Sequence, residues 1–329
     1  MVALERTGDG GRPHAESRAL AVAGNEAVGG TAYVTLEPCA HVGKTPPCCE
    51  ALIQAGVSTV FIAVKDPDPR VCGRGIARLR ASGVSVHVGL CEEEARYINR
   101  AFLSRIERRR PLVGLKVASS QDGRIALASG ESKWITGEAA RAFGHRLRAE
   151  FQAILVGIGT VLADDPSLDC RLTGLSNRSP VPVVLDRRGQ LPLKSKLVRS
   201  ARDRKLVVYS GTETSADWAA GIEAAGAILV SSSDHNESFD LNKVMVDLID
   251  QGVNSLLVEG GGKTHAAFLS SGLVDEVYWF SASKIIGAEG KVAIADLGHQ
   301  NMSDVHQFQR VFEQRLGEDS LFILQRKKV

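Results

Sequence analysis

The sequence is poor in long apolar runs, in aromatic residues and in net charge, and each shortage argues against a class of protein. No apolar run is long enough to predict a transmembrane helix. Aromatic residues make up 5% of the 329 residues and the formal net charge is +2, so we expect neither a nucleic-acid partner nor a membrane surface as partner. Residues 1–11 lack a basic region followed by an apolar one, so we expect no signal peptide.

Cysteine is also scarce for a chain of this length. The six cysteines stand at positions 39, 48, 49, 72, 91 and 170. Such a chain does not form a small disulfide framework, and cysteines near histidine indicate a metal in a reducing compartment. We therefore expect a cytoplasmic protein. The four cysteines outside the motif described next are predicted to be packing residues: Cys49, Cys72, Cys91 and Cys170.

One stretch carries the side chains that a catalytic zinc ion needs. His14 stands two residues before Glu16, and Pro38-Cys39 is followed by Cys48. Zinc binds nitrogen and sulfur tetrahedrally, and three protein ligands leave a fourth position for water. A carboxylate that does not bind the metal can move the proton. Zinc-dependent base deaminases use this arrangement, with the signature H-x-E followed by P-C-x-x-C. The sequence therefore predicts zinc on His14, Cys39 and Cys48, with Glu16 as catalytic acid and base.

The spacing of the two cysteines departs from that signature. Eight residues separate Cys39 from Cys48, and they include Gly43 and the pair Pro46-Pro47, so the segment can loop out and return. A structural zinc site or a reduced pair of structural cysteines is the alternative. A structural site has no use for Glu16 and is usually closed by a fourth protein ligand.

The first third of the chain alternates helical and extended patterns and ends at Pro111. We expect helices over residues 14–23, 47–55, 76–81 and 92–109, and strands over residues 31–37, 58–64 and 84–88. The short basic run over residues 105–110 is interpreted as a solvated helix end. This order is typical of a sheet covered by helices.

The second part reads as a larger α/β sheet whose last strands form an antiparallel edge. Strands are expected over residues 112–119, 153–156, 181–185, 206–209, 228–231, 255–259, 277–281, 308–314 and 320–325. Helices are expected over residues 138–150, 216–225, 241–251 and 264–270.

Two glycine-rich turns follow strands of this second part. The run Val258-Glu259-Gly260-Gly261-Gly262-Lys263 follows an apolar strand and opens a helix, where bare backbone N–H groups suit a phosphate. Such a turn is also common without any ligand. The run Gly157-Ile158-Gly159-Thr160 begins like a dinucleotide fingerprint, but Leu162 stands where the third glycine belongs, so a Rossmann fold is not predicted. Glu259 is expected to be paired, because a carboxylate at a buried strand end is costly otherwise.

Longer motifs in both parts match one family. The motifs H-A-E and E-P-C-A-H-V-G-K-T-P-P-C resemble the deaminase half of the bifunctional riboflavin-biosynthesis deaminase/reductase. The segments L-K-V-A-S-S-Q-D-G (115–123), S-K-W-I-T (132–136), I-L-V-G-I-G-T-V-L-A-D-D-P (154–166) and V-E-G-G-G (258–262) are similar to its reductase half. The resemblance covers residues 12–329. It implies a cytidine-deaminase-like α/β/α zinc domain over residues 1–110 and a dihydrofolate-reductase-like α/β domain over residues 111–329.

The resemblance also implies the reactions. The first domain would hydrolyse the 2-amino group of 2,5-diamino-6-(5-phosphoribosylamino)pyrimidin-4-one. The second would reduce the ribosyl side chain to a ribityl chain with NADPH. It implies one zinc ion per chain, a small pyrimidine ribose phosphate as substrate, and a homo-oligomer formed through the reductase domain.

Roles for single residues come from the same resemblance. Substrate contacts in the first domain would be His41 and Lys44. Lys116, Asp164 and Glu259 would lie near the reacting sugar. Further substrate contacts would be Ser132, Arg148, Leu168 and Arg171, and the two arginines fit bidentate phosphate recognition. Cofactor contacts would be Ala118, Trp134, Thr160, Asp164, Gly261, Gly262, Lys263, Thr264, His265, Ala266 and Ala267.

Several of these residues have a simpler reading. Without the resemblance, Trp134 would be interpreted as a core aromatic residue and Arg148 as a surface charge on a helix. Asp164 would be interpreted as the cap of a turn before Pro166. His41 and Lys44 would be ordinary loop residues.

The chain differs from the family pattern at its beginning. Members usually carry several dozen residues before H-A-E, including a T-x-P-N-P-x-V-G segment, whereas thirteen residues precede His14 here. A start site assigned too late, which we favour, a deliberately shortened protein and an incomplete deaminase half are the three explanations. For the chain as written we expect weak deaminase activity and an intact reductase.

Two other functions are open at this point. The chain could be a reductase alone, with a structural zinc domain. It could also be a nucleoside or tRNA base deaminase with an unrelated C-terminal domain. The low aromatic content and near-neutral charge argue against the latter.

Overall fold

The computed structural model describes residues 1–41, 46–232 and 239–327, and the chain divides into two compact units, Met1–Arg109 and Arg110–Val329. Each unit has its own sheet and its own apolar core. No helix within the described ranges is long and apolar enough to cross a membrane.

The first unit contains a parallel sheet of three strands in the order β1-β2-β3. Its strands are β1 (Thr31–Val34), β2 (Thr59–Ile62) and β3 (Ser85–Val88), and its helices are α1 (Ala15–Ala23), α2 (Cys48–Gln54), α3 (Arg74–Ala81), α4 (Glu92–Ile98) and α5 (Arg100–Arg108). Short 3₁₀ turns lie at Asp9–Gly11 and Gly24–Ala27.

Helices α1, α2 and α3 pack on one face of this sheet. Alternate side chains of β2, Val60 and Ile62, are fully buried against Leu52 of α2 and Leu79 of α3. This period of two is what a strand with one buried face requires. The opposite face carries Tyr33, Phe61 and His87 in a stack across the three strands.

The single helix predicted over residues 92–109 is wrong, because the helix is interrupted at Asn99. The side chain of Asn99 donates hydrogen bonds to the carbonyls of Ala95 and Thr35, at 2.9 and 3.4 Å. Asparagine side chains compete in this way with the backbone ladder of a helix. The prediction followed the helix-like pattern of the whole segment and missed this local competition.

The second unit is built on a nine-stranded sheet in the order β13-β14-β11-β4-β10-β6-β7-β8-β9. Its strands are β4 (Leu112–Ser120), β6 (Ala153–Gly157), β7 (Val181–Asp186), β8 (Val207–Gly211), β9 (Ile228–Ser232), β10 (Ser255–Glu259), β11 (Glu276–Ala282), β13 (Phe308–Leu316) and β14 (Asp319–Arg326). A separate two-stranded ribbon pairs β5 (Arg124–Ala126) with β12 (Lys291–Val292). The helices are α6 (Glu138–Glu150), α7 (Ile158–Asp164), α8 (Lys196–Arg199), α9 (Ala216–Ala224), α10 (Leu241–Asp250) and α11 (Gly262–Ser270), with 3₁₀ turns at Ser176–Arg178 and Met302–Asp304.

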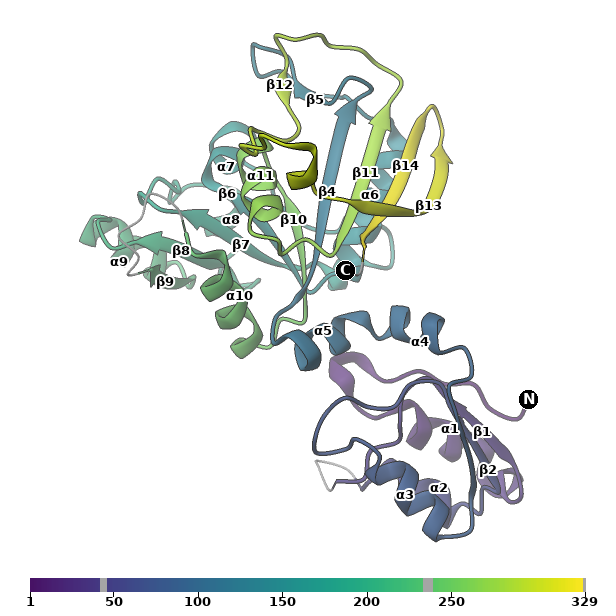
Figure 1. Cartoon of the computed structure of the whole chain (residues 1–329). Coiled ribbons are helices and arrows are strands. Elements are labelled where there is room, and N and C mark those ends of the chain that lie inside the picture. Colours follow the sequence, from purple (N-terminus) through teal and green to yellow (C-terminus); the bar gives the residue numbers. More distant parts are fainter. Residues whose placement is uncertain (42–45, 233–238, 328–329) are drawn as a thin grey trace. The chain divides into compact units, whose positions relative to one another are not determined.

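Strands β4 and β6–β11 run parallel, and β14 and β13 are antiparallel, which confirms the predicted antiparallel edge. Helices α10 and α11 cover one face of the sheet and α6 the other (Figure 1). Leu115 and Val117 of β4 face the α10–α11 side, so Gly114, Lys116 and Ala118 face α6, because side chains alternate along a strand. Helix α7, which was not predicted, follows Gly157 directly.

The prediction that four cysteines are packing residues is right for two of them. Cys49 and Cys170 are buried, whereas Cys72 and Cys91 are exposed. Cys72 lies in the turn before α3. Cys91 precedes α4 in a left-handed backbone conformation, with φ of 53°. Both lie in connecting segments on the surface.

We expect Gly114→Ala to destabilise the second unit by about 1–3 kcal/mol, because a core side chain without free space forces its neighbours to move. The added methyl would lie 2.6 Å from Cζ of Phe151 and 3.0 Å from Cε2 of Tyr278. Urea unfolding measures the loss. The matched control is Gly159→Ala in α7, where a methyl meets nothing within 4 Å, and it should leave the unfolding free energy unchanged or slightly higher.

Candidate active sites

The three predicted metal ligands lie together in the first unit. His14 is the residue before α1, Cys39 lies in the segment after β1, and Cys48 opens α2. Their ligand atoms all lie within 4.8 Å of one another, with Nδ1 of His14 3.7 Å from Sγ of Cys39 and 3.1 Å from Sγ of Cys48. Tetrahedral zinc at ordinary bond lengths separates such atoms by about 3.5–3.8 Å. The donor set and its spacing fit zinc.

The backbone at the start of α2 orients Cys39. The N–H of Cys48 donates to Sγ of Cys39 at 3.3 Å, and the N–H of Cys49 donates to the carbonyl of Cys39 at 3.2 Å. Hydrogen bonds from the Cys48 thiol, from His14 and from the backbone N–H of Cys48 lower the pKa of the Cys39 thiol to about 4. A thiolate is the form that binds a metal.

Glu16 lies in the first turn of α1, beside this cluster. Burial raises the pKa of its carboxyl, while the nearby His14 lowers it in part. A carboxyl whose pKa is moved toward neutrality can both take and give a proton. Glu16 therefore has the properties of a general acid and base.

The two predicted substrate contacts of this unit are His41 and Lys44. His41 is half-buried, and its Nδ1 atom is buried without a hydrogen-bond partner among the described residues. A bound polar molecule could satisfy that atom. Lys44 lies outside the described residues.

In the second unit, Lys116 of β4 and Glu259 of β10 are paired across adjacent strands. Arg148 of α6 forms a bidentate ion pair with Glu259, with Nε and Nη2 at 3.0 and 2.8 Å from the two carboxylate oxygens. Its Nη1 donates to the carbonyl of Asp169 at 3.1 Å. Nζ of Lys116 lies 3.8 Å from Glu259. The expectation that Glu259 is paired is confirmed.

This network keeps Glu259 charged. Burial raises the pKa of its carboxyl, but Arg148 and Lys116 outweigh burial and hold the pKa at about 2. Near neutral pH the group is a carboxylate and cannot donate a proton. The alternative reading of Arg148 as a surface charge is wrong, because its side chain is 17% exposed and paired.

Arg148 and Arg171 differ in how many guanidinium nitrogens remain available to bind a phosphate. Three donor nitrogens of Arg148 already bind Glu259 and Asp169. The side chain of Arg171 is 66% exposed, and its Nε lies 3.6 Å from a carboxylate oxygen of Asp169. Arg171 therefore has the more accessible guanidinium.

The two glycine turns approach each other at the carboxyl ends of β6 and β10. A methyl on Gly157 would lie 2.7 Å from Oγ1 of Thr264, and a methyl on Gly262 would lie 2.5 Å from the carbonyl of Val292. Neither α7 nor α11 has a side-chain cap at its start. Their first N–H groups have no acceptor inside the helix and face toward the turns, which suits the phosphates of a dinucleotide.

Two of the predicted cofactor residues, His265 and Ala266, have buried side chains. Nδ1 of His265 contacts the carbonyl of Ala293 at 2.7 Å, and its Nε2 accepts from the N–H of Gly260 at 3.3 Å. Burial lowers the pKa of His265 and so favours the neutral ring that these contacts need. The His265 side chain shapes the glycine turn from within.

The remaining predicted cofactor and substrate residues lie on several elements of the second unit. Trp134 is 61% exposed, so the core reading is wrong, and the guanidinium of Arg141 stacks 4.6 Å from its ring. Nζ of Lys284 donates a hydrogen bond to the backbone carbonyl of Trp134 at 2.6 Å. The exposed residues are Asp164, Lys263 and Ala267, and the half-buried ones are Ala118, Ser132, Thr160, Gly261, Gly262 and Thr264.

The role of Arg204 was not predicted. Its guanidinium donates to the carbonyls of Ser167, Leu168 and Pro180 at 2.6–2.9 Å. Leu168 is 2% exposed, with φ of 52°, so this predicted substrate contact can reach a ligand only through its backbone. Arg204 holds the backbone of residues 167–168 in place. It belongs to a short basic segment whose sequence looks like that of an ordinary solvated loop.

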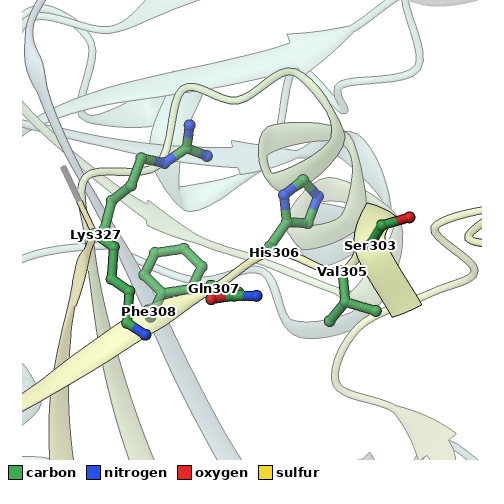
Figure 2. A pocket seen from close by; sticks show the side chains of 7 residues that line it. Ser303, Val305, His306, Gln307, Phe308 and Lys327 are labelled. Carbon is green, nitrogen blue, oxygen red and sulfur yellow. The ribbon is translucent and has the colours of Figure 1, made fainter. Parts of the chain in front are cut away.

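A cavity of about 470 Å³ lies elsewhere in the second unit, between the start of β13 and the end of β14. Figure 2 shows the side chains around it, among them His306 and Phe308. None of the predicted site residues lines it, so we do not identify it with either candidate active site.

Comparisons with known proteins identify the family to which each unit is similar. Residues 111–321 match the RibD C-terminal domain, and residues 3–64 match the cytidine and deoxycytidylate deaminase zinc-binding region. The riboflavin biosynthesis protein RibD of Aquifex aeolicus is 38% identical over 96% of this chain and 86% of its own length. That of Escherichia coli is 39% identical over 94% and 85%. The structure of Acinetobacter baumannii RibD has a TM-score of 0.86 at 38% identity, covering 96% of this chain and 86% of that one.

A zinc-binding deaminase unit followed by an α/β reductase unit defines the class: a bifunctional hydrolase and oxidoreductase with zinc and NADPH as cofactors. The chain belongs to the RibD family of riboflavin biosynthesis proteins. The predicted family, fold class and pair of activities are thereby confirmed.

We expect Glu259→Gln to destabilise the second unit by about 3 kcal/mol at pH 7, because Arg148 would remain buried without its carboxylate. The pKa of Glu259 is lower in the folded chain than in the unfolded one, so its contribution is complete above about pH 4.5 and is lost as the pH falls toward 2. The difference between the wild type and the variant should therefore shrink below pH 4.5 in urea unfolding.

The matched control for that variant is Glu150→Gln. The pair of Glu150 with Arg146 is exposed on the same helix as Arg148. Its loss should cost less than about 1 kcal/mol at any pH. Equal effects of the two variants would contradict a buried, ionised Glu259.

Proposed function

We propose that residues 1–110 are the deaminase domain and residues 111–329 the reductase domain, acting in turn on one pyrimidine ribose phosphate. The observation that carries this proposal is the convergence of His14, Cys39 and Cys48 beside Glu16. The Lys116–Glu259 pair beside two glycine turns supports the second half.

In the deaminase step, His14, Cys39 and Cys48 would hold zinc through Nδ1 and the two sulfurs. Zinc, when bound, supplies Lewis-acid activation of water near neutral pH. Glu16 takes a proton from the attacking water and passes it to a ring nitrogen. It then carries the remaining hydroxyl proton to the amino group, so the 2-amino group departs as ammonia and a carbonyl remains. His41 and Lys44 hold the pyrimidine or its phosphate.

In the reductase step, NADPH, when bound, would supply the hydride that, together with a proton from solvent, converts the ribosyl chain to a ribityl chain. Lys116, Asp164 and Glu259 lie at the reacting sugar, where the Lys116 ammonium can donate a hydrogen bond to a sugar oxygen. Glu259 remains ionised and keeps Lys116 in place. Ser132, Arg148, Leu168 and Arg171 position the substrate, with Arg171 on the phosphate.

The cofactor would be held at the glycine turns, where backbone N–H groups at the starts of α7 and α11 are available to its phosphates. The residues that contact it are Ala118, Trp134, Thr160, Asp164, Gly261, Gly262, Lys263, Thr264, His265, Ala266 and Ala267. His265 and Ala266 contribute through their backbone, since their side chains are buried. We place the enzyme in the cytoplasm as a homo-oligomer formed through the reductase domain, with no nucleic-acid or membrane partner.

We expect Glu16→Gln to reduce ammonia release by about 10²–10⁴-fold, because the amide cannot shuttle the proton. Bound zinc, measured by elemental analysis, should stay at the wild-type level, since Glu16 is not among the clustered ligand atoms. Glu26→Gln, an exposed acid in the same unit, is the control. Unchanged ammonia release in Glu16→Gln would overturn the deaminase assignment.

We expect Lys116→Ala to abolish NADPH oxidation with the deaminated substrate while NADPH itself still binds. The reason is that Lys116 lies beside Glu259, whereas the cofactor phosphates are placed at the glycine turns. Single-turnover absorbance at 340 nm and cofactor titration separate the two quantities. Lys205→Ala, an exposed lysine of the same unit, should behave like the wild type. A variant at Lys116 with wild-type turnover refutes its role.

A further inference from the structure

Glu37 is a buried carboxylate that the mechanism above does not use. It follows β1, is 3% exposed, and receives three backbone N–H groups. Its Oε2 accepts from Gly73 at 2.9 Å and from Asp66 at 3.3 Å, and its Oε1 accepts from Ile76 at 3.1 Å. Two of these donors belong to the start of α3, where a negative charge is favourable.

The same helix start touches the backbone between Glu37 and the metal ligand. A methyl on Gly75 would lie 2.1 Å from the carbonyl oxygen of Pro38. No side chain fits there, so α3 rests directly on the residue before Cys39. The carboxylate contacts and this close approach together hold residues 37 and 38 against the start of α3.

Cys39 depends on this support because it lies in neither a helix nor a strand. On its downstream side, the N–H groups of Cys48 and Cys49 hold its sulfur and its carbonyl. On its upstream side, the contacts of Glu37 are joined by one backbone hydrogen bond, from the N–H of Glu37 to the carbonyl of Val64. A ligand fixed from both sides keeps its geometry before the metal arrives.

We propose that Glu37 is a positioning residue of the metal centre: it fixes the segment before Cys39 against the start of α3, so that the sulfur stays within reach of His14 and Cys48. The inference rests on the proposed metal centre. Glu37 touches neither metal nor substrate, and it acts through the backbone of Pro38 and Cys39.

The test uses the full chain and cobalt(II) as a probe, because thiolate-to-cobalt charge-transfer and d–d bands report ligand geometry without turnover. Glu37→Gln keeps the size of the side chain but turns an amide NH₂ toward the N–H donors of α3. We expect the affinity for cobalt to fall by about tenfold or more, with altered bands. Glu50→Gln, which loses an ion pair with Arg78, should match the wild type in its affinity for cobalt and in its absorption bands.

Two further variants separate positioning from general stability. Gly75→Ala leaves all charges in place and pushes on Pro38, so it should reproduce the loss of affinity and the altered bands. Val84→Ala removes core contacts of the same unit and should lower its unfolding temperature while leaving cobalt binding intact. If Glu37→Gln does not fold, Gly75→Ala decides by the same two measurements.

The proposal is overturned if Glu37→Gln and Gly75→Ala bind cobalt with wild-type affinity and spectrum, whatever their stability. A wild-type chain that binds no cobalt or zinc would refute the metal centre itself, and the role of Glu37 with it. Wild-type binding together with weakened binding in both variants supports the proposal.

Discussion

The first unit depends on bringing one nitrogen and two sulfur atoms to a single point from three separate places in the chain. The parallel sheet makes this possible, because the end of β1 meets the starts of α1 and α2. Helix starts offer free N–H groups, and here one of them holds the sulfur of Cys39. The start of α2 thus also helps to lower the pKa of the Cys39 thiol.

The second unit keeps a cluster of charges largely buried, formed by Lys116, Arg148 and Glu259. Glu259 ends a strand whose residues are all buried, and it is tolerable there because Arg148 and Lys116 surround it. The pair across β4 and β10 lies on the face of the sheet that α6 covers. The two glycine turns lie at the carboxyl ends of β6 and β10, which are adjacent in the sheet.

Much of this architecture could be predicted from the sequence. The β-branched and apolar runs gave the positions of nearly all strands to within a few residues. The H-x-E and P-C motifs, together with the later Cys48, identified the cluster before any coordinates. These features are local in the chain or belong to a motif. The interruption at Asn99 and the short helix α7 were not predicted, because a single side chain or a turn determines where these helices begin and end.

The supporting contacts could not have been read from the sequence. Glu37 and Arg204 bind backbone groups that lie 29–39 and 24–37 residues away, so nothing in their neighbourhood marks them. His265 looks like a ligand in a glycine-rich motif, yet its ring lies inside the fold. Pairings of this kind depend on tertiary structure, and sequence patterns describe only neighbours.

The close approach of Gly157 to Thr264 has a consequence for how this protein can vary. Two positions more than one hundred residues apart share the space of a single methyl group, since Oγ1 of Thr264 would lie 2.7 Å from any side chain at position 157. A larger residue at 157 becomes acceptable only together with a smaller one at 264. Across a set of relatives, these two positions should therefore change as a pair.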